Sequence, residues 1–370
     1  MNKLLTAALL MLGLTGCTGT QEPAEPLGIV VSVNEDGTDR LKRISNLRLD
    51  PESELYDPAN PIDLSVDLPA PPVGLANTPS NDRLTTLLLV GFAQQLVFYD
   101  ANLKPLASPH PLTVPDGKCL ESFQVTLDTS GGNPVLSALI DNCGAAPNDF
   151  SGQALWVYAL AENRQLAVVN NPAPDSAIAP YQPPSNVSVY GYTASRNRLF
   201  FTQQRLGTSY LYEVNLNTTP LTCRPNGETL PCFGQPLNGR IYDVGLYANG
   251  GVMALEDGVY PIAEGSQGTR LLEAPVRQLL GSPTLLIGYV PNNSRFRLLS
   301  AQATGSIRDV YLYEGGARDL TISSDGYAWF LNGSALYRAD VAGVREDITA
   351  PTPMSVSLSN PRFLSWVQLD

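Results

Sequence analysis

The chain has 370 residues, of which 43% are hydrophobic and 16% are charged. This composition excludes an intrinsically disordered chain, because such chains are poor in hydrophobic residues and rich in charge. The 23 basic and 35 acidic residues give a net charge of −12, which excludes nucleic acid as a partner of the surface as a whole. A single histidine excludes histidine-rich metal sites and typical zinc or copper ligation.

The first 16 residues predict an export signal. Lys3 supplies a positive charge, and the apolar segment 4–14 follows it without any charge, as in a signal peptide. This segment of about 11 residues is much shorter than the roughly 20 that a membrane-spanning helix needs. We therefore interpret it as a cleaved signal and not as a transmembrane anchor.

The signal segment ends in Leu14-Thr15-Gly16-Cys17, which resembles the bacterial lipobox. This four-residue resemblance implies a lipoprotein signal peptide over 1–16 and diacylglycerol on Cys17. Lipoproteins of this kind usually carry a further acyl chain such as palmitate, and two chains anchor a protein stably where one does so only marginally. An ordinary secretory peptide with a chance cysteine is the alternative. We expect residues 17–27 to be a lipidated cysteine and tether that hold an extracytoplasmic protein of the cell envelope to a membrane.

Residues 28–370 predict one all-β domain, in which short apolar runs alternate with clusters of Gly, Asn, Asp, Ser and Pro. One type of apolar-aromatic run recurs at spacings near the roughly 40 to 50 residues of propeller blades, and an earlier copy at 29–33 and 40–44 brings the number of units to seven. The pattern predicts a β-propeller of seven blades with four antiparallel strands each, with a β-sandwich as the alternative. The recurring runs are centred on Phe98, Val157, Tyr212, Tyr260, Leu298 and Tyr337.

The last apolar run, 363–369, comes too late to start another blade. We expect it to join the N-terminal strands and close the ring, which removes the exposed sheet edges. Ser323-Ser324-Asp325-Gly326-Tyr327 is the nearest match to a repeated Ser-Pro-Asp-Gly turn, and here the chain resembles the TolB-like and YncE-like bacterial propellers. The resemblance extends over 28–370 as architecture, although the other blades keep only parts of this turn.

Four further cysteines, an even number in an exported chain, predict two disulfide bonds. A hairpin folded about Gly131 places Cys119 opposite Cys143, and Cys223 and Cys232 bracket a turn-rich loop. We expect these two pairs to form, each stabilising the fold by roughly 2 to 3 kcal/mol. A four-thiolate metal site is the alternative, but it lacks any Cys-x-x-Cys spacing.

Two proline-rich segments, 50–79 and 170–184, predict long loops on a face of the propeller. The first offers carboxylate oxygens that suit calcium, but without the alternating spacing of a calcium loop, so a solvated acidic surface is the main interpretation. Its carboxylates are Asp50, Glu52, Glu54, Asp57, Asp63 and Asp67.

Other candidate site residues favour structural roles. His110 lies between two prolines, and we expect it in a solvated loop. The tryptophans occur in strand-like runs, which indicates blade core and not a cofactor stack. Tyrosine pairs such as Tyr190 and Tyr192 share one face of a strand, which favours packing between blades, with a glycan or protein contact as the alternative. The tryptophans are Trp156, Trp329 and Trp366.

The sequence shows no phosphate-binding loop or nucleophile elbow in the required strand-turn-helix setting. We therefore expect a lipid-anchored, non-catalytic binding or scaffold protein that needs no cofactor. Its expected partners are the membrane, through the lipid, and an envelope protein or glycan. The alternative is a propeller hydrolase or lyase that uses carboxylates and a bound calcium. A third hypothesis is an assembly factor for outer-envelope proteins.

Overall fold

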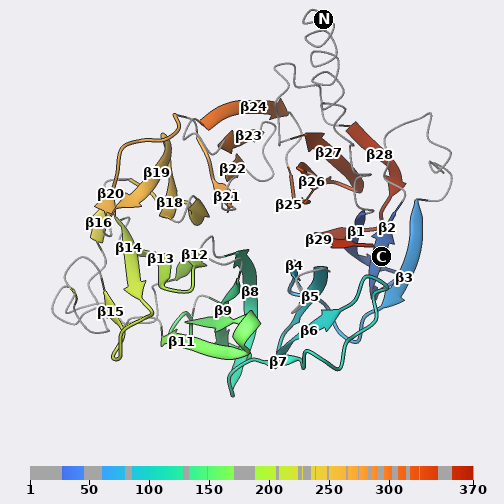
Figure 1. Ribbon diagram of the computed structural model, residues 1–370, viewed down its shortest axis with the longest axis horizontal. Helices are drawn as coiled ribbons and strands as arrows, with labels where there is room; N and C mark the ends of the chain where they lie inside the picture. The colour runs from blue at the N-terminus through green and yellow to red at the C-terminus, as the bar shows by residue number, and fades with distance from the viewer. Residues whose placement is uncertain are drawn as a thin grey trace, which may run out of the picture.

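The protein is represented by a computed structural model. The described residues run from 27 to 369, with gaps at 46–60, 80–85, 128–132, 171–187, 341–351 and shorter loop segments. Its strands form antiparallel sheets arranged as blades around one axis (Figure 1). Among the described residues the one helical element is the short 3-10 helix η1 (Leu160–Glu162). No helix in this part of the chain is long and apolar enough to cross a membrane.

The first half of the ring consists of four blades, each described here from its innermost strand outward. Blade 1 contains β29 (Pro361–Gln368), β1 (Leu27–Glu35), β2 (Thr38–Ile44) and β3 (Ile62–Asp67). Blade 2 contains β4 (Gly74–Pro79), β5 (Thr86–Phe92), β6 (Gln95–Tyr99) and β7 (Leu112–Thr113). Blade 3 contains β8 (Lys118–Leu127), β9 (Pro134–Asn142), β10 (Ala154–Ala159) and β11 (Arg164–Asn170). Blade 4 contains β12 (Val189–Ala194), β13 (Arg198–Arg205), β14 (Thr208–Asn215), β15 (Thr222–Cys223) and, also paired with β14, β16 (Gln235–Leu237).

Three further blades complete the ring. Blade 5 contains β17 (Asp243–Tyr247), β18 (Gly250–Leu255), β19 (Gly258–Ala263) and β20 (Ser266–Gln267). Blade 6 contains the pair β21 (Gln278–Gly281) and β22 (Leu286–Tyr289), next to the pair β23 (Phe296–Ala301) and β24 (Ile307–Tyr313). Blade 7 contains β25 (Asp319–Ile322), β26 (Tyr327–Asn332), β27 (Ala335–Asp340) and β28 (Thr352–Ser357). The predicted seven-bladed propeller is confirmed.

The predicted ring closure is also confirmed. The C-terminal strand β29 pairs antiparallel with β1, with Leu27 opposite Gln368 and Val31 opposite Leu364. It is the innermost strand of blade 1 and lies beside β4 and β25 of the two neighbouring blades. All six of the recurring apolar-aromatic runs fall in the third strand of a blade, in β6, β10, β14, β19, β23 and β27.

The core consists of apolar side chains packed between neighbouring blades. Trp329 of blade 7 and Trp366 of blade 1 are buried in one cluster, and Trp156 is buried between blades 2 and 3. The predicted core role of the tryptophans is confirmed. At the junction of blades 2 and 3, the ring of Phe123 occupies the space that a side chain at Gly91 would need, since an added Cβ would lie 2.4 Å from its Cε1.

The prediction of one long loop over 50–79 was wrong in its second part, which contains β3 and β4. In β3 the apolar residues Ile62, Leu64 and Val66 are more buried than the polar residues between them, which is the alternation of an outer strand with one covered face. The proline content of the segment obscured this alternation. On β3, Asp63 pairs with Arg43 and Asp67 pairs with Arg40.

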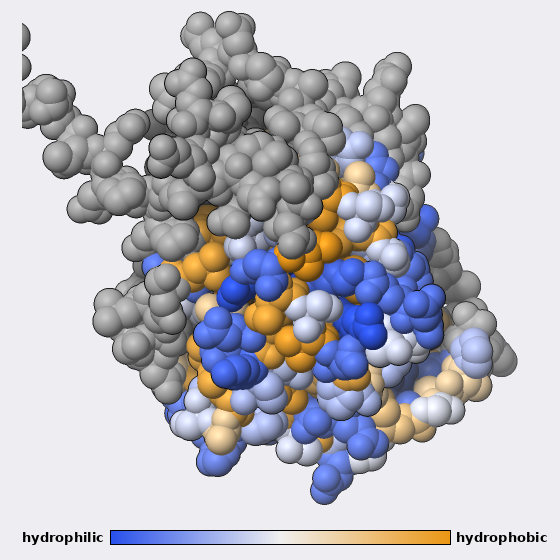
Figure 2. Space-filling view, turned by 90° about the vertical axis from the view of Figure 1, so that its right-hand side faces the viewer, coloured by the Kyte–Doolittle hydropathy of each residue, from blue (hydrophilic) through white to orange (hydrophobic). Residues whose placement is uncertain are grey.

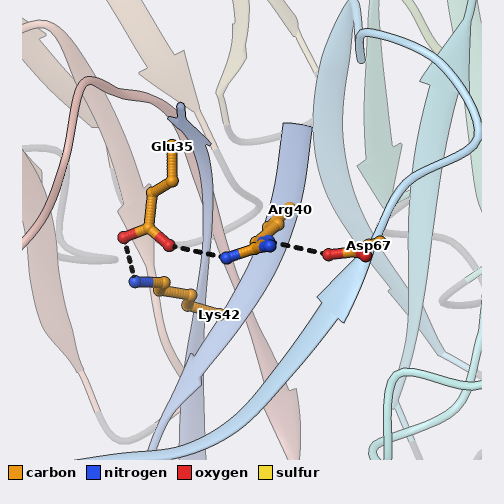
Figure 3. Close-up of polar contacts among 4 residues, drawn as sticks. All are labelled: Glu35, Arg40, Lys42 and Asp67. Atoms are coloured by element: carbon orange, nitrogen blue, oxygen red, sulfur yellow. Dashed lines mark hydrogen bonds and ion pairs between the residues drawn. The ribbon is translucent and has the colours of Figure 1, made fainter. Parts of the chain in front are cut away.

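Blade 1 carries a network of charges on its outer part. Arg40 on β2 lies between Glu35 on β1 and Asp67 on β3, and Lys42 also pairs with Glu35 (Figure 3). The side-chain hydrogen bond and the charge of Lys42 lower the pKa of Glu35. On the flank of the ring, hydrophilic residues surround smaller hydrophobic areas (Figure 2).

The Cys119–Cys143 disulfide is confirmed, with Cα atoms 4.9 Å apart, but its predicted register was wrong. Cys119 lies opposite Asp141, because the hairpin pairs Leu127 with Pro134, one residue off the predicted register, and a bulge between Leu120 and Ser122 shifts the pairing by one more. Cys143 therefore follows the end of β9, where its N–H donates to the carbonyl of Gly117 at 3.2 Å.

Candidate functional site

All innermost strands of a propeller run in the same direction along its axis, because every blade is built from the inside outward. We call the face at which these strands begin the start face. Arg240, Arg277 and Arg318 lie there, just before β17, β21 and β25. Leu27, at the beginning of β1, lies at the opposite face, since it pairs with Gln368 at the end of β29.

Polar side chains of β8 bind β12 of the next blade. Ser122, Gln124 and Thr126 are every second residue of β8 and so point to the same side. The Ser122 hydroxyl is 2.7 Å from the Tyr192 hydroxyl, the Gln124 amide donates to the Tyr192 carbonyl, and the Thr126 hydroxyl donates to the carbonyl of Ala194. These hydrogen bonds join the innermost strands of blades 3 and 4, beside the apolar cluster at the same junction.

The same kind of hydrogen bond occurs at four junctions between described blades. In each, a side-chain oxygen of one blade accepts a backbone N–H in or just before the innermost strand of the following blade. The oxygen acceptors belong to two neutral residues and two aspartates. The pairs are Gln153 with Val189 at 3.0 Å, Ser209 with Ile241 at 3.0 Å, Asp243 with Leu279 at 2.8 Å, and Asp319 with Leu364 at 2.8 Å.

Asp243 and Asp319 are the most perturbed carboxyls of the described chain. Burial between the innermost strands raises the pKa of each to about 7, against the opposing effect of the backbone N–H groups that they accept. The phenol of Tyr289, from blade 6, lies between them, and its pKa is raised by burial and then by the negative charges of Asp319 and Asp243. Asp243 and Asp319 therefore change protonation near neutral pH, whereas the phenol of Tyr289 stays protonated.

The series of acidic and phenolic groups continues into blades 4 and 3. Burial raises the pKa of the Tyr192 phenol, and the charges of Asp243 and Glu121 act in the same direction. Glu121 keeps contact with solvent, while burial on its other side and the nearby charge of Asp141 raise its pKa. We call the set Glu121, Tyr192, Asp243, Tyr289 and Asp319 the axial cluster.

Within the axial cluster Asp243 and Asp319 can exchange protons near neutral pH and can accept hydrogen bonds. Its carboxyls are spread over separate blades, and the described residues contain no group of three or more metal-ligating side chains. Both oxygens of Asp243 already accept backbone N–H groups, one from Val244 and one from Leu279. The arrangement therefore joins blades as well as supplying titratable groups.

The cysteines predicted to carry function are described only in part. Cys17 lies outside the described residues. Cys223 is disulfide-bonded, and Cys232, its predicted partner, also lies outside the described residues. Of the acidic segment, Asp63 and Asp67 are paired with arginines. The other carboxylates, Asp50, Glu52, Glu54 and Asp57, lie outside the described residues, as does most of 170–184.

His110 is exposed in the loop between β6 and β7, as predicted. Tyr210 and Tyr212 of β14 form another tyrosine pair of the same spacing, and both pack in one apolar cluster between blades 3 and 4, which confirms the packing role predicted for such pairs. The prediction that Tyr190 and Tyr192 share one face of a strand was wrong. A bulge interrupts β12 between Val189 and Gly191.

Sequence reasoning missed Asp243 and Asp319. The available signal was a single carboxylate directly before an apolar strand, in Asp243-Val244 and Asp319-Leu320. That signal is weak, since aspartate is also common in turns. The contacts that give these residues their role join positions 36 and 45 residues apart in the sequence.

No protein-family model matches the sequence, and no curated protein matches it. Among solved structures, the Pseudomonas aeruginosa periplasmic gluconolactonase PpgL has 14% identity and a TM-score of 0.55, over 93% of this chain and 100% of that chain. The Cps50 (Swd1) β-propeller domain of Myceliophteria thermophila has 9% identity and a TM-score of 0.51, over 80% of this chain and 90% of that chain. These identities show the fold alone. The chain is a β-propeller closed by its C-terminal strand.

Proposed function

We propose that this protein is a lipid-anchored, extracytoplasmic β-propeller that binds another component of the cell envelope without catalysing a reaction. The observation that carries the non-catalytic role is the use of the axial carboxyls as acceptors between blades. Asp243 and Asp319 accept backbone N–H groups of β21 and β29 at 2.8 Å. These carboxyls are committed to holding the ring, which leaves the exposed faces to bind a partner.

The position of Leu27 supports an anchored orientation. Because β1 begins at the face opposite the start face, a tether from Cys17 joins the propeller at that opposite face. The start face then points away from the membrane. Two acyl chains on Cys17 and the new amino terminus suffice for stable attachment.

Membrane fractionation tests the anchor. The wild type is expected in the membrane fraction, in a processed form that incorporates labelled palmitate. Cys17→Ser is expected to lose the label and the processing that depends on the lipid. A Cys17→Ser protein with unchanged labelling and processing would overturn the anchor.

Cross-linking in native membranes, followed by purification of the full chain, tests the binding role. A specific envelope protein or glycan should be recovered in stoichiometric amount with the wild type. A matched sample of detergent-solubilised, heat-unfolded protein controls for capture through unfolded chain. Recovery of no specific component across independent cross-linkers would contradict the proposal. Recovery of outer-envelope proteins during their assembly would favour the assembly-factor hypothesis.

The raised pKa values of Asp243 and Asp319 favour a hydrolase or lyase as the second candidate. A carboxyl with a pKa of about 7 is well suited to act as a general base near neutral pH. Lactone hydrolysis is the first activity to assay, because the gluconolactonase of P. aeruginosa has the same fold. Lactone hydrolysis that is lost in Asp243→Asn but kept in Asp36→Asn would support this candidate. Stoichiometric calcium, with a lower melting temperature in chelator, would support the metal-dependent form.

A further inference from the structure

Arginines of the described chain are mostly paired with carboxylates. Arg40 contacts Glu35 and Asp67 (Figure 3), and Arg270 contacts Asp257 and Glu273. Such pairing is expected in a chain with a net charge of −12, because carboxylates outnumber cations. An exposed arginine without a carboxylate therefore stands out.

Arg240 and Arg277 are both exposed. Neither has an ion-pair partner among the described residues. Both guanidinium groups lie over the ring of Tyr242 instead. The guanidinium carbon is 5.2 Å from the ring centroid for Arg240 and 3.8 Å for Arg277. The two carbons are thus at most about 9 Å apart, the sum of these distances, and the ring holds both cations by cation–π attraction.

The two arginines come from separate blades but meet at the start face. Arg240 precedes β17 of blade 5, and Arg277 precedes β21 of blade 6. Arg277 is held from its backbone, since its N–H donates to the Tyr289 carbonyl at 3.0 Å. The backbone of Arg277 is thus fixed to the end of β22 in its own blade.

The nearest carboxyl in sequence does not neutralise them. Asp243 follows Arg240 by three positions, but its pKa is raised to about 7 by burial, and no arginine is among the groups that lower it. A guanidinium within about 4 to 6 Å would stabilise the charged carboxylate and lower its pKa. The two like charges thus remain uncompensated by protein groups in the described chain.

Two unpaired guanidinium groups at this spacing suit an oxyanion. The central atom of a carboxylate or phosphate lies about 4 Å from the carbon of a guanidinium that binds it with two parallel hydrogen bonds, so one oxyanion can bridge two guanidinium carbons up to about 8 Å apart. The carbons of Arg240 and Arg277 exceed this reach only if the Tyr242 ring lies directly between them. The charge of Arg240 also acts on the Tyr190 phenol. That phenol lies 3.1 Å from the Ser209 hydroxyl.

We propose that Arg240, Arg277 and Tyr242 form a binding site for the oxyanion group, carboxylate or phosphate, of a ligand that docks on the start face. Tyr242 is a positioning residue that holds the two cations together. This inference names the ligand chemistry of the binding role and rests on that proposed function.

Isothermal titration of the purified full chain at low ionic strength tests the site. The probes are inorganic phosphate and D-glucuronate, which separate the two oxyanion sources, and D-glucose as the uncharged control. We expect saturable binding of at least one anion and none of glucose. Arg240→Gln/Arg277→Gln should weaken anion binding by about tenfold or more, because each charge-assisted bond to arginine is strong. Arg240→Lys/Arg277→Lys keeps the charge but loses the planar guanidinium group. Its anion affinity should lie between those of the wild type and of Arg240→Gln/Arg277→Gln.

The matched control is Arg164→Gln/Arg196→Gln, which removes the same charge from two arginines that pair with Glu162. It should leave binding within about twofold of the wild type, because exposed pairs contribute little. Equal melting temperatures establish that both double variants fold. No saturable binding of either anion, or equal loss in the control variant, would overturn the site.

The two proposals fail separately. A partner that is cross-linked equally well by the wild type and by Arg240→Gln/Arg277→Gln, without anion binding, would overturn the oxyanion site and keep the binding role. Anion binding by the purified chain, with no partner recovered from membranes, would overturn the binding role and keep the site.

Discussion

Replacing Asp243 by asparagine should change how the stability of the propeller depends on pH. In the folded protein burial raises the pKa of Asp243 to about 7, whereas an unfolded chain keeps an aspartate near about 3.9. Between these values the folded state binds more protons than the unfolded state. The free energy of unfolding therefore falls as pH rises from about 4 to about 7, and it levels off above that range.

The difference between the folded and unfolded pKa of Asp243 sets how much the free energy of unfolding changes with pH. From pH 5 to pH 8 one such carboxyl lowers the free energy of unfolding by at most about 3 kcal/mol, and by less where water reaches the side chain. Asparagine keeps an acceptor for the Leu279 N–H but loses the second acceptor, used by Val244, at about 1 kcal/mol. At pH 5, about one unit above the unfolded pKa, the wild type has already lost about 1 kcal/mol relative to its protonated form, so Asp243→Asn should equal the wild type there and exceed it by about 2 to 3 kcal/mol at pH 8.

Urea unfolding at a series of pH values from 5 to 8, with disulfides intact, measures this difference. Asp319 and the other groups titrate in both proteins and cancel in the comparison. Asp36→Asn is the control, because Asp36 is exposed in the turn after β1, at a φ of 50° that asparagine also adopts. A difference between Asp243→Asn and the wild type that is constant with pH would refute the reasoning, since the carboxyl would then be ionised throughout.

Two more stability changes can be measured by the same unfolding experiment. Gly91→Ala places a Cβ 2.4 Å from Cε1 of Phe123 and should cost about 1 to 3 kcal/mol. In a Phe123→Leu background that atom is absent, so an equal cost there would show that the contact is not the cause. Replacing Cys119 and Cys143 by serine removes a link between residues 24 positions apart and should cost about 3 kcal/mol. An unchanged urea midpoint would contradict this.

The architecture could be predicted from sequence because the third strand of each blade carries an apolar run that packs on the second strand and into the core. Tyr212 in β14 stacks on Phe201 of β13 with centroids 4.5 Å apart, and Tyr337 in β27 stacks on Phe330 of β26 at 5.4 Å. Apolar or aromatic runs recur at this position in six blades, so their spacing, with the earlier copy at 29–33 and 40–44, gave the number of blades. Ring closure followed from a run too late to begin another unit.

Local irregularities and contacts between distant residues were not predictable in this way. The bulge between Leu120 and Ser122 depends on how β8 fits its neighbours, and nothing in the local composition marks it. β3 was missed because acidic residues and prolines dominate its surroundings, although Ile62, Leu64 and Val66 alternate. Asp243 acquires its role only when the ring brings β21 beside β17.

The pairing of β1 with β29 also determines when the ring can close during synthesis of the chain. The strand that fills the centre of blade 1 is synthesised after the other described strands of the ring, so the inner edge of β1 has no partner until the strands of all seven blades have been made. An unpaired edge of this kind favours pairing with other chains, and incomplete chains expose it longest. Truncated products should therefore be readily recognised by chaperones and proteases, while the finished ring leaves them no such edge at this blade.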